Sequence, residues 1–109
     1  MGGPLAVKKM MSFEDDLQLS SIRSDVTRLM NILSDPSSEV ASSALNNIKK
    51  YRPDFEKYGL ASIYRDYIRE AAKNTPHYDV KVGIIGELYR LDDFEGLAAI
   101  GKNPSAGMR

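Results

Sequence analysis

The feature that most constrains the fold is a partial internal repeat at a spacing of about 40 residues. Three pairs of stretches carry it: residues 36–40 against 76–80, residues 54–56 against 93–95, and residues 59–63 against 96–100. This spacing predicts a duplicated helix-pair unit, with copies at 35–74 and 75–101 inside an all-helical domain spanning residues 12–101. The flanking residues 1–11 and 102–109 are predicted to form a disordered N-terminal arm and a flexible C-terminal tail.

The apolar spacing predicts helices throughout this domain. No Asn-Gly or Asp-Gly hairpin and no sustained two-residue alternation indicates a strand. Ser12 followed by Asp15 is a capping-box pattern, which predicts a helix start. The helical spacing slips between Leu17 and Ile22, which leaves open either one long helix or two shorter helices divided near residue 20.

Prolines predict the borders of the later helices. Asp-Pro at 35–36 and Thr-Pro at 75–76 each place a capping side chain before a proline, whose missing N–H would have no partner at the first helical position. Pro53 is predicted to end the second helix, because a proline pushes the preceding residue, Arg52, out of the α region.

Two of the predicted helices differ in how much of their surface is apolar. Residues 60–72 follow an i, i+4, i+7, i+8, i+11 pattern, which covers about half of a helix. Residues 80–91 are apolar over most of the circumference, with Gly83 and Gly86 on the remaining side. Such a helix is expected to be covered on several sides. Only a short turn, at residues 97–100, is predicted to follow it.

This organisation resembles the HEAT and armadillo class of α-solenoid repeats, on the stretch D-P-S-S-E-V-A-S-S-A-L-N-N-I followed by D-F-E-K-Y-G-L-A-S-I. The resemblance covers residues 35 to about 100 and implies an all-α, short right-handed helical-repeat bundle of about four to five helices. It also implies that the second helices line a concave binding surface. The second copy departs from the family pattern because its periodic sequence ends near Gly101, and an ordinary four- or five-helix bundle is the alternative.

Charge and cysteine content narrow the classes of function. Fifteen acidic and fifteen basic residues give a formal net charge of zero, so a dedicated nucleic-acid binder is not expected. The chain has no cysteine, which excludes disulfides and thiol chemistry and favours a reducing, cytoplasmic setting. No apolar run approaches the roughly 20 residues of a membrane helix, so no membrane partner is predicted.

No group of residues in the sequence predicts catalysis, a cofactor or a metal. His77, the only histidine, lacks a catalytic partner at a meaningful spacing. The acidic pairs at 15–16 and 92–93 fall at predicted helix starts, where the helix dipole favours negative charge. We therefore predict a non-enzymatic protein-interaction or scaffold module that needs no cofactor. The alternatives are a nucleic-acid-associated helical protein, and an accessory subunit of an enzyme or a small hydrolase that uses carboxylates.

A basic set of side chains, together with one tyrosine, is the first candidate for contact with a partner. It contains an i, i+4, i+8 ridge on the third helix, opposite its apolar arc, together with residues around the first link: Arg65, Arg69, Lys73, Lys49, Lys50 and Tyr58. Asp66 and Glu70 lie beside the ridge at ion-pair spacing, so a solvated helix face is the competing interpretation.

An apolar set is the second candidate and predicts an oligomer interface: Val82, Ile85, Tyr89 and Leu97. These side chains are expected to form an exposed strip, because too little sequence follows the fourth helix to cover it. Such a strip predicts a protein partner or a homo-oligomer. The alternative is that the C-terminal tail or the first helix folds over the strip and leaves a monomer.

Overall fold

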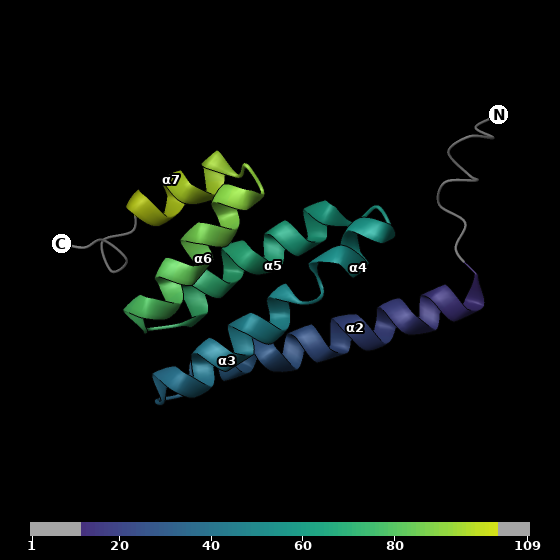
Figure 1. Ribbon diagram of the computed structural model, residues 1–109, viewed down its shortest axis with the longest axis horizontal. Coiled ribbons are helices and arrows are strands. Elements are labelled where there is room, and N and C mark those ends of the chain that lie inside the picture. The colour runs from purple at the N-terminus through teal and green to yellow at the C-terminus, as the bar shows by residue number, and fades with distance from the viewer. Residues whose placement is uncertain (1–11, 103–109) are drawn as a thin grey trace.

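Residues 12–102, the part of the chain that the computed structural model describes, form α-helices joined by short turns and contain no strand (Figure 1). Its helices are α2 (Phe13–Ile32), α3 (Ser38–Lys49), α4 (Arg52–Lys57), α5 (Ala61–Asn74), α6 (Tyr78–Arg90) and α7 (Phe94–Lys102). The prediction of an all-α fold is confirmed. The predicted arm, 1–11, and residues 103–109 of the predicted tail lie outside the described residues, whereas Lys102 is the last residue of α7.

Helix α2 begins where the capping box predicts and continues without a break. The Ser12 hydroxyl accepts a hydrogen bond from the Asp15 N–H at 3.0 Å, and the Asp15 carboxylate accepts one from the Ser12 N–H at 3.3 Å. This reciprocal pair satisfies two N–H groups at the helix start. Of the two alternatives, the structure has one long helix, whose buried residues keep a spacing of three or four across residue 20: Leu19, Ile22, Val26 and Leu29.

Helices α3 and α6 begin two residues later than the Asp-Pro and Thr-Pro patterns predict. Asp35 Oδ1 accepts a hydrogen bond from the Ser37 N–H at 2.8 Å, and Thr75 Oγ1 accepts one from the His77 N–H at 3.3 Å. Each proline therefore lies inside a side-chain-stabilised turn, and the N-cap residues are Ser37 and His77. The predicted first residues of both helices were therefore wrong, although the same kind of turn precedes α3 and α6.

The expectation that Pro53 ends a helix and holds Arg52 out of the α region was wrong. Arg52 is the first residue of α4 and Pro53 is the second. At this position proline costs no helical hydrogen bond, because the first N–H groups of a helix have no partner inside it. The segment predicted as a link therefore contains a short helix.

The turns after α4 and α6 have the same geometry. Gly59 and Asp92 both have positive φ, at 74° and 56°, a conformation that glycine adopts freely and aspartate tolerates. In each turn the next N–H donates to a carbonyl five residues earlier, at 2.8 Å and 2.9 Å. These hydrogen bonds are typical of a Schellman helix end, and α5 and α7 begin shortly after them.

Residues that the later part of the sequence repeat aligns do not occupy equivalent environments in the structure. The sequence aligns Phe55 with Phe94. Phe55 is fully buried in α4, whereas Phe94 begins α7 and is 63% exposed. The reason is the extra helix, α4, which fills the first link and has no counterpart in the short turn between α6 and α7.

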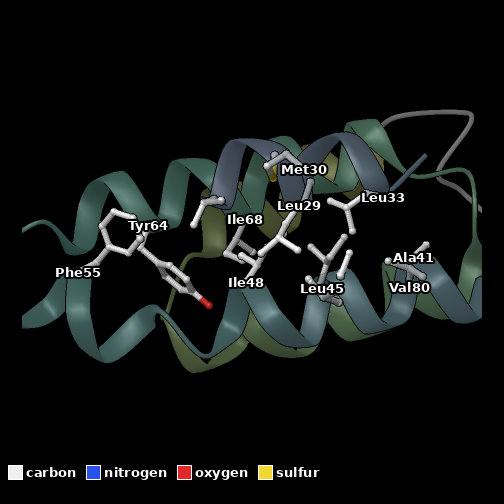
Figure 2. Packing of buried hydrophobic residues seen from close by; sticks show 14 of the residues in the cluster. Leu29, Met30, Leu33, Ala41, Leu45, Ile48, Phe55, Tyr64, Ile68 and Val80 are labelled. Carbon is white, nitrogen blue, oxygen red and sulfur yellow. The ribbon is translucent and has the colours of Figure 1, made fainter. Parts of the chain in front are cut away.

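The core runs along the contacts of α3 with α2 and α6, and of α5 with α2, α4 and α6. Figure 2 shows it extending from Phe55 and Tyr64 at one end to Ala41 and Val80 at the other. The rings of Phe55 and Tyr64 pack in a tilted arrangement with centroids 5.9 Å apart. Helix α7 contacts α6, so the C-terminal helix is attached to the edge of this core.

Candidate protein-interaction surfaces

The basic ridge predicted on α5 is partly engaged in ion pairs within the chain. Arg69 donates to Asp93 through Nε at 2.6 Å and through a terminal nitrogen at 2.5 Å, a bidentate arrangement. Lys73 Nζ lies 3.8 Å from Glu70 Oε1. The ridge therefore faces the start of α7 at Arg69, and only part of it faces solvent.

Asp93 is the centre of the contact between α5 and α7. The Arg69 guanidinium holds the pKa of the Asp93 carboxyl below its usual range. The Gly96 N–H and the charge of Arg65 act in the same direction, and burial opposes them. A Cβ on Gly96 would collide with the Asp93 carboxylate, so the absence of a side chain there allows the carboxylate to lie over the first turn of α7. Asp93 thus joins α7 to α5 through Arg69, a residue of the basic ridge predicted opposite the apolar arc of α5.

The lowered pKa of Asp93 predicts a pH-dependent contribution to stability. A carboxyl with a lower pKa in the folded state stabilises the fold above its unfolded pKa, about 3.9, and this stabilisation is lost as the pH falls through the folded value. We expect Asp93→Asn to be less stable than the unchanged chain at about pH 6, with the difference shrinking as the pH falls below about 4. Urea unfolding across this range measures it.

The matched control is Glu95→Gln, because Glu95 is the exposed second partner of Arg69, at 3.4 Å. Its effect on stability should be small at every pH, since solvent screens an exposed pair. A difference between Asp93→Asn and the unchanged chain that stays constant with pH would contradict the assignment.

A pocket of about 190 Å³ lies beside this ion pair, between α5 and α7. Its lining combines two cations, one carboxylate and small or apolar residues: Arg69, Ala72, Lys73, Glu95, Gly96, Ala99 and Ile100. No serine, cysteine or histidine is among these residues. The lining can hold a small apolar group beside charge.

The structure does not gather the predicted basic residues into one surface. Lys50 is exposed and lines an open groove against α2, together with Asp25 and Tyr51. Lys49 and Tyr58 are half-buried, and Tyr58 packs against the core. The basic set is therefore divided between the α2–α3 side and the α5–α7 side of the molecule.

A buried polar cluster that the sequence did not predict joins α4, α5 and α6. Glu87 is 2% exposed. Its Oε2 accepts hydrogen bonds from the Tyr64 hydroxyl at 2.7 Å and from Arg52 at 3.2 Å. Burial, followed by the interaction with Glu87, raises the pKa of the Tyr64 hydroxyl, so the hydroxyl stays a proton donor. The one sequence signal is that Glu87 falls on the apolar face shared by Val80 and Ile84.

The outer face of α6 carries a row of apolar side chains, three exposed and one half-buried, which we call the α6 strip: Tyr78, Val82, Ile85 and Tyr89. Their spacing of four, three and four residues returns to one face of a helix. Tyr78, Val82 and Tyr89 are 71%, 49% and 62% exposed, and Ile85 is half-buried. Tyr78 was not among the residues predicted for this strip.

The strip lies away from the faces of α6 that other helices cover. At Gly83, an added Cβ would lie 3.0 Å from Leu45 of α3, so this glycine marks the side that packs on α3. At Gly86, next to the strip, an added Cβ would meet no atom within 4 Å. Leu97, predicted to belong to the strip, is half-buried and packs against the core instead.

No protein-family model matches the chain, and neither a curated protein nor a solved structure matches it significantly. Within residues 12–102, no helix is both long enough and apolar enough to cross a membrane. In the same part of the chain, no three His, Cys, Asp or Glu side chains are grouped in a way that could hold a metal ion. What the chain binds must therefore be inferred from its own surface.

Proposed function

We propose that this chain is a non-enzymatic protein-interaction module of the HEAT-like helical-repeat type, and that the α6 strip is its binding surface. The observation that carries the proposal is the exposure of Tyr78, Val82 and Tyr89 on one face of one helix. Contiguous exposed apolar rows of this kind mark interaction sites on soluble domains, whereas single exposed apolar residues do not.

The contacts between the two units support the helical-repeat part of the proposal. Helices α3 and α6, the first helices of the two predicted copies, pack directly on each other. Their N-terminal ends are joined by a hydrogen bond from the Ser38 hydroxyl to Asp79 Oδ2, at 3.2 Å. His77 Nε2 lies 2.6 Å from the carbonyl oxygen of Asp35, which links the two equivalent turns. Neighbouring units of a helical-repeat array pack in register in this manner.

The same arrangement explains why α6 would need a partner. In a repeat array each unit covers one side of its neighbour, so a face that no neighbouring helix covers is available to a partner. Helix α6 contacts α3, α5 and α7, and the described helices leave Tyr78, Val82 and Tyr89 exposed. A partner that covered Tyr78, Val82 and Tyr89 would bury further apolar surface, at about 25 cal/mol for each Å² of apolar area.

Removal of the apolar surface tests the proposal. We expect the double variant Val82→Glu/Tyr89→Glu to lose the proteins that the unchanged chain captures from an extract of its native cells. The matched control is Leu17→Glu, because Leu17 is an exposed apolar residue of similar exposure on α2. Both variants should keep the helical circular dichroism of the unchanged chain, since the substituted side chains lie outside the core.

The comparison of the two variants decides the proposal. Loss of captured proteins with the double variant and retention with Leu17→Glu is the expected result. Identical captured proteins with all three chains, or equal loss with both variants, would contradict a binding role for the α6 strip.

A further inference from the structure

We infer that the occupant of the α6 strip is a second copy of this chain, with the two α6 helices packed antiparallel about a two-fold axis. The inference rests on the proposed function, because it takes the α6 strip as the binding surface and names what covers it. A symmetric dimer requires one surface to be complementary to itself.

The order of residues along the α6 strip has this self-complementarity. The strip has its centre between Gly83 and Ile84. Val82 lies 1.5 residues before this centre, and Ile85 lies 1.5 residues after it. Tyr78 and Tyr89 lie 5.5 residues to either side of the same centre. In an antiparallel pair with its two-fold axis at this centre, each Tyr78 faces Tyr89 of the other copy, and each Val82 faces Ile85 of the other copy.

The chemistry of the facing residues suits this pairing. Each end of the interface would bring two tyrosine rings together, and each half of the centre would bring two β-branched side chains together. No charged residue belongs to the α6 strip, so the pairing does not bury an unpaired charge. Gly86 leaves open space beside Ile85, which lets a second helix approach closely.

The overall charge permits association of identical chains. A large net charge keeps copies of a protein apart, because like charges repel over the distance of approach. This chain has a formal net charge of zero and an isoelectric point of about 6.6. Two copies therefore meet without a long-range electrostatic barrier.

The available area sets the strength of the dimer. A tyrosine side chain buries about 150–250 Å² when fully covered, so the exposed parts of the α6 strip offer on the order of 400 Å² per copy. Two copies would bury on the order of 800 Å², below the roughly 1,200–2,000 Å² of stable complexes. The structure therefore predicts a weak, concentration-dependent dimer with a dissociation constant on the order of 100 µM.

Single cysteine substitutions test the pairing, because the natural chain contains no cysteine. In a mixture of Tyr78→Cys and Tyr89→Cys chains under mild oxidation, the disulfide between different variants should form in at least about tenfold excess over disulfides between identical variants. Positions 78 and 89 are eleven residues apart, about 16 Å along the helix. Two identical cysteines in the antiparallel pair are therefore too far apart to bond, since a disulfide needs Cα atoms within about 7 Å. A mixture of Tyr78→Cys with Leu17→Cys is the control and should give no preferred disulfide.

Other outcomes overturn the inference. Equal yields of all disulfides indicate random collision, and a preference for identical variants indicates a parallel pair. A chain that stays monomeric in sedimentation equilibrium up to about 1 mM, tenfold above the expected dissociation constant, also overturns it.

The proposed function fails separately, when Val82→Glu/Tyr89→Glu leaves the captured proteins unchanged. Capture of a different protein through the α6 strip would keep the proposed function and refute the second copy.

Discussion

Replacement of Glu87 by alanine is expected to lower the free energy of unfolding by about 2–4 kcal/mol. The variant leaves the buried Tyr64 hydroxyl without its acceptor and Arg52 without its buried partner. Arg52 is a third exposed and can be hydrated, so most of the loss should come from the hydroxyl and from the space left by the side chain. Small domains have only about 5–15 kcal/mol of stability in total, and urea unfolding will resolve the change.

The matched control is Glu56→Ala, which removes the other carboxylate near Arg52. Glu56 is half-exposed and its oxygen lies 3.9 Å from Arg52 Nε. An exposed pair at this distance contributes about 0–1 kcal/mol, so the control should be nearly neutral. Similar losses for Glu87→Ala and Glu56→Ala would contradict the description of Glu87 as the centre of a buried cluster.

Replacement of Phe55 by alanine is expected to be the other strongly destabilising change, at about 3–5 kcal/mol. Phe55 is fully buried and its ring contacts those of Tyr64 and Tyr67, so alanine leaves a cavity between α4 and α5. The sequence repeat supplies the control, because Phe94 is the residue aligned with Phe55. Phe94 is largely exposed, and Phe94→Ala should change the stability by no more than about 0.5 kcal/mol.

Thermal and urea unfolding of Phe55→Ala and Phe94→Ala test whether the two aligned phenylalanines contribute equally to stability. If the aligned phenylalanines were structurally equivalent, the two alanine variants would lose similar stability. A loss above about 2 kcal/mol for Phe94→Ala would contradict its position on the surface at the start of α7.

Local signals in the sequence predicted the helices best. The capping box at Ser12 depends on residues three positions apart, and the apolar spacing of residues 60–72 repeats within one segment, so both can be recognised without knowing the neighbouring helices. Helix α4 was missed because Pro53 is compatible with a helix end and with a helix start, and only the burial of Phe55 favours the start. The predicted starts of α3 and α6 lay two residues too early, because the residue types that cap a helix also stabilise a turn just before it.

The candidate surfaces also differ in how much of them the sequence could predict. The sequence predicted the exposure of Val82 and Tyr89 because α6 is apolar over most of its circumference, a property of composition and order. The ion pair of Arg69 with Asp93 and the burial of Glu87 depend on residues 23 to 35 positions away. Such pairs form only when several helices have packed, and no local pattern in one sequence specifies them.

Photo-crosslinking in the native cell tests the binding role of the α6 strip most directly. A photoreactive amino acid at position 89 is predicted to form a discrete covalent adduct with a protein, whether that protein is a second copy of the chain or another partner. The same amino acid at position 17, which is similarly exposed on α2, is predicted to give no discrete adduct. The same adducts from both positions, or no adduct from position 89, would contradict the assignment of the α6 strip as the binding surface.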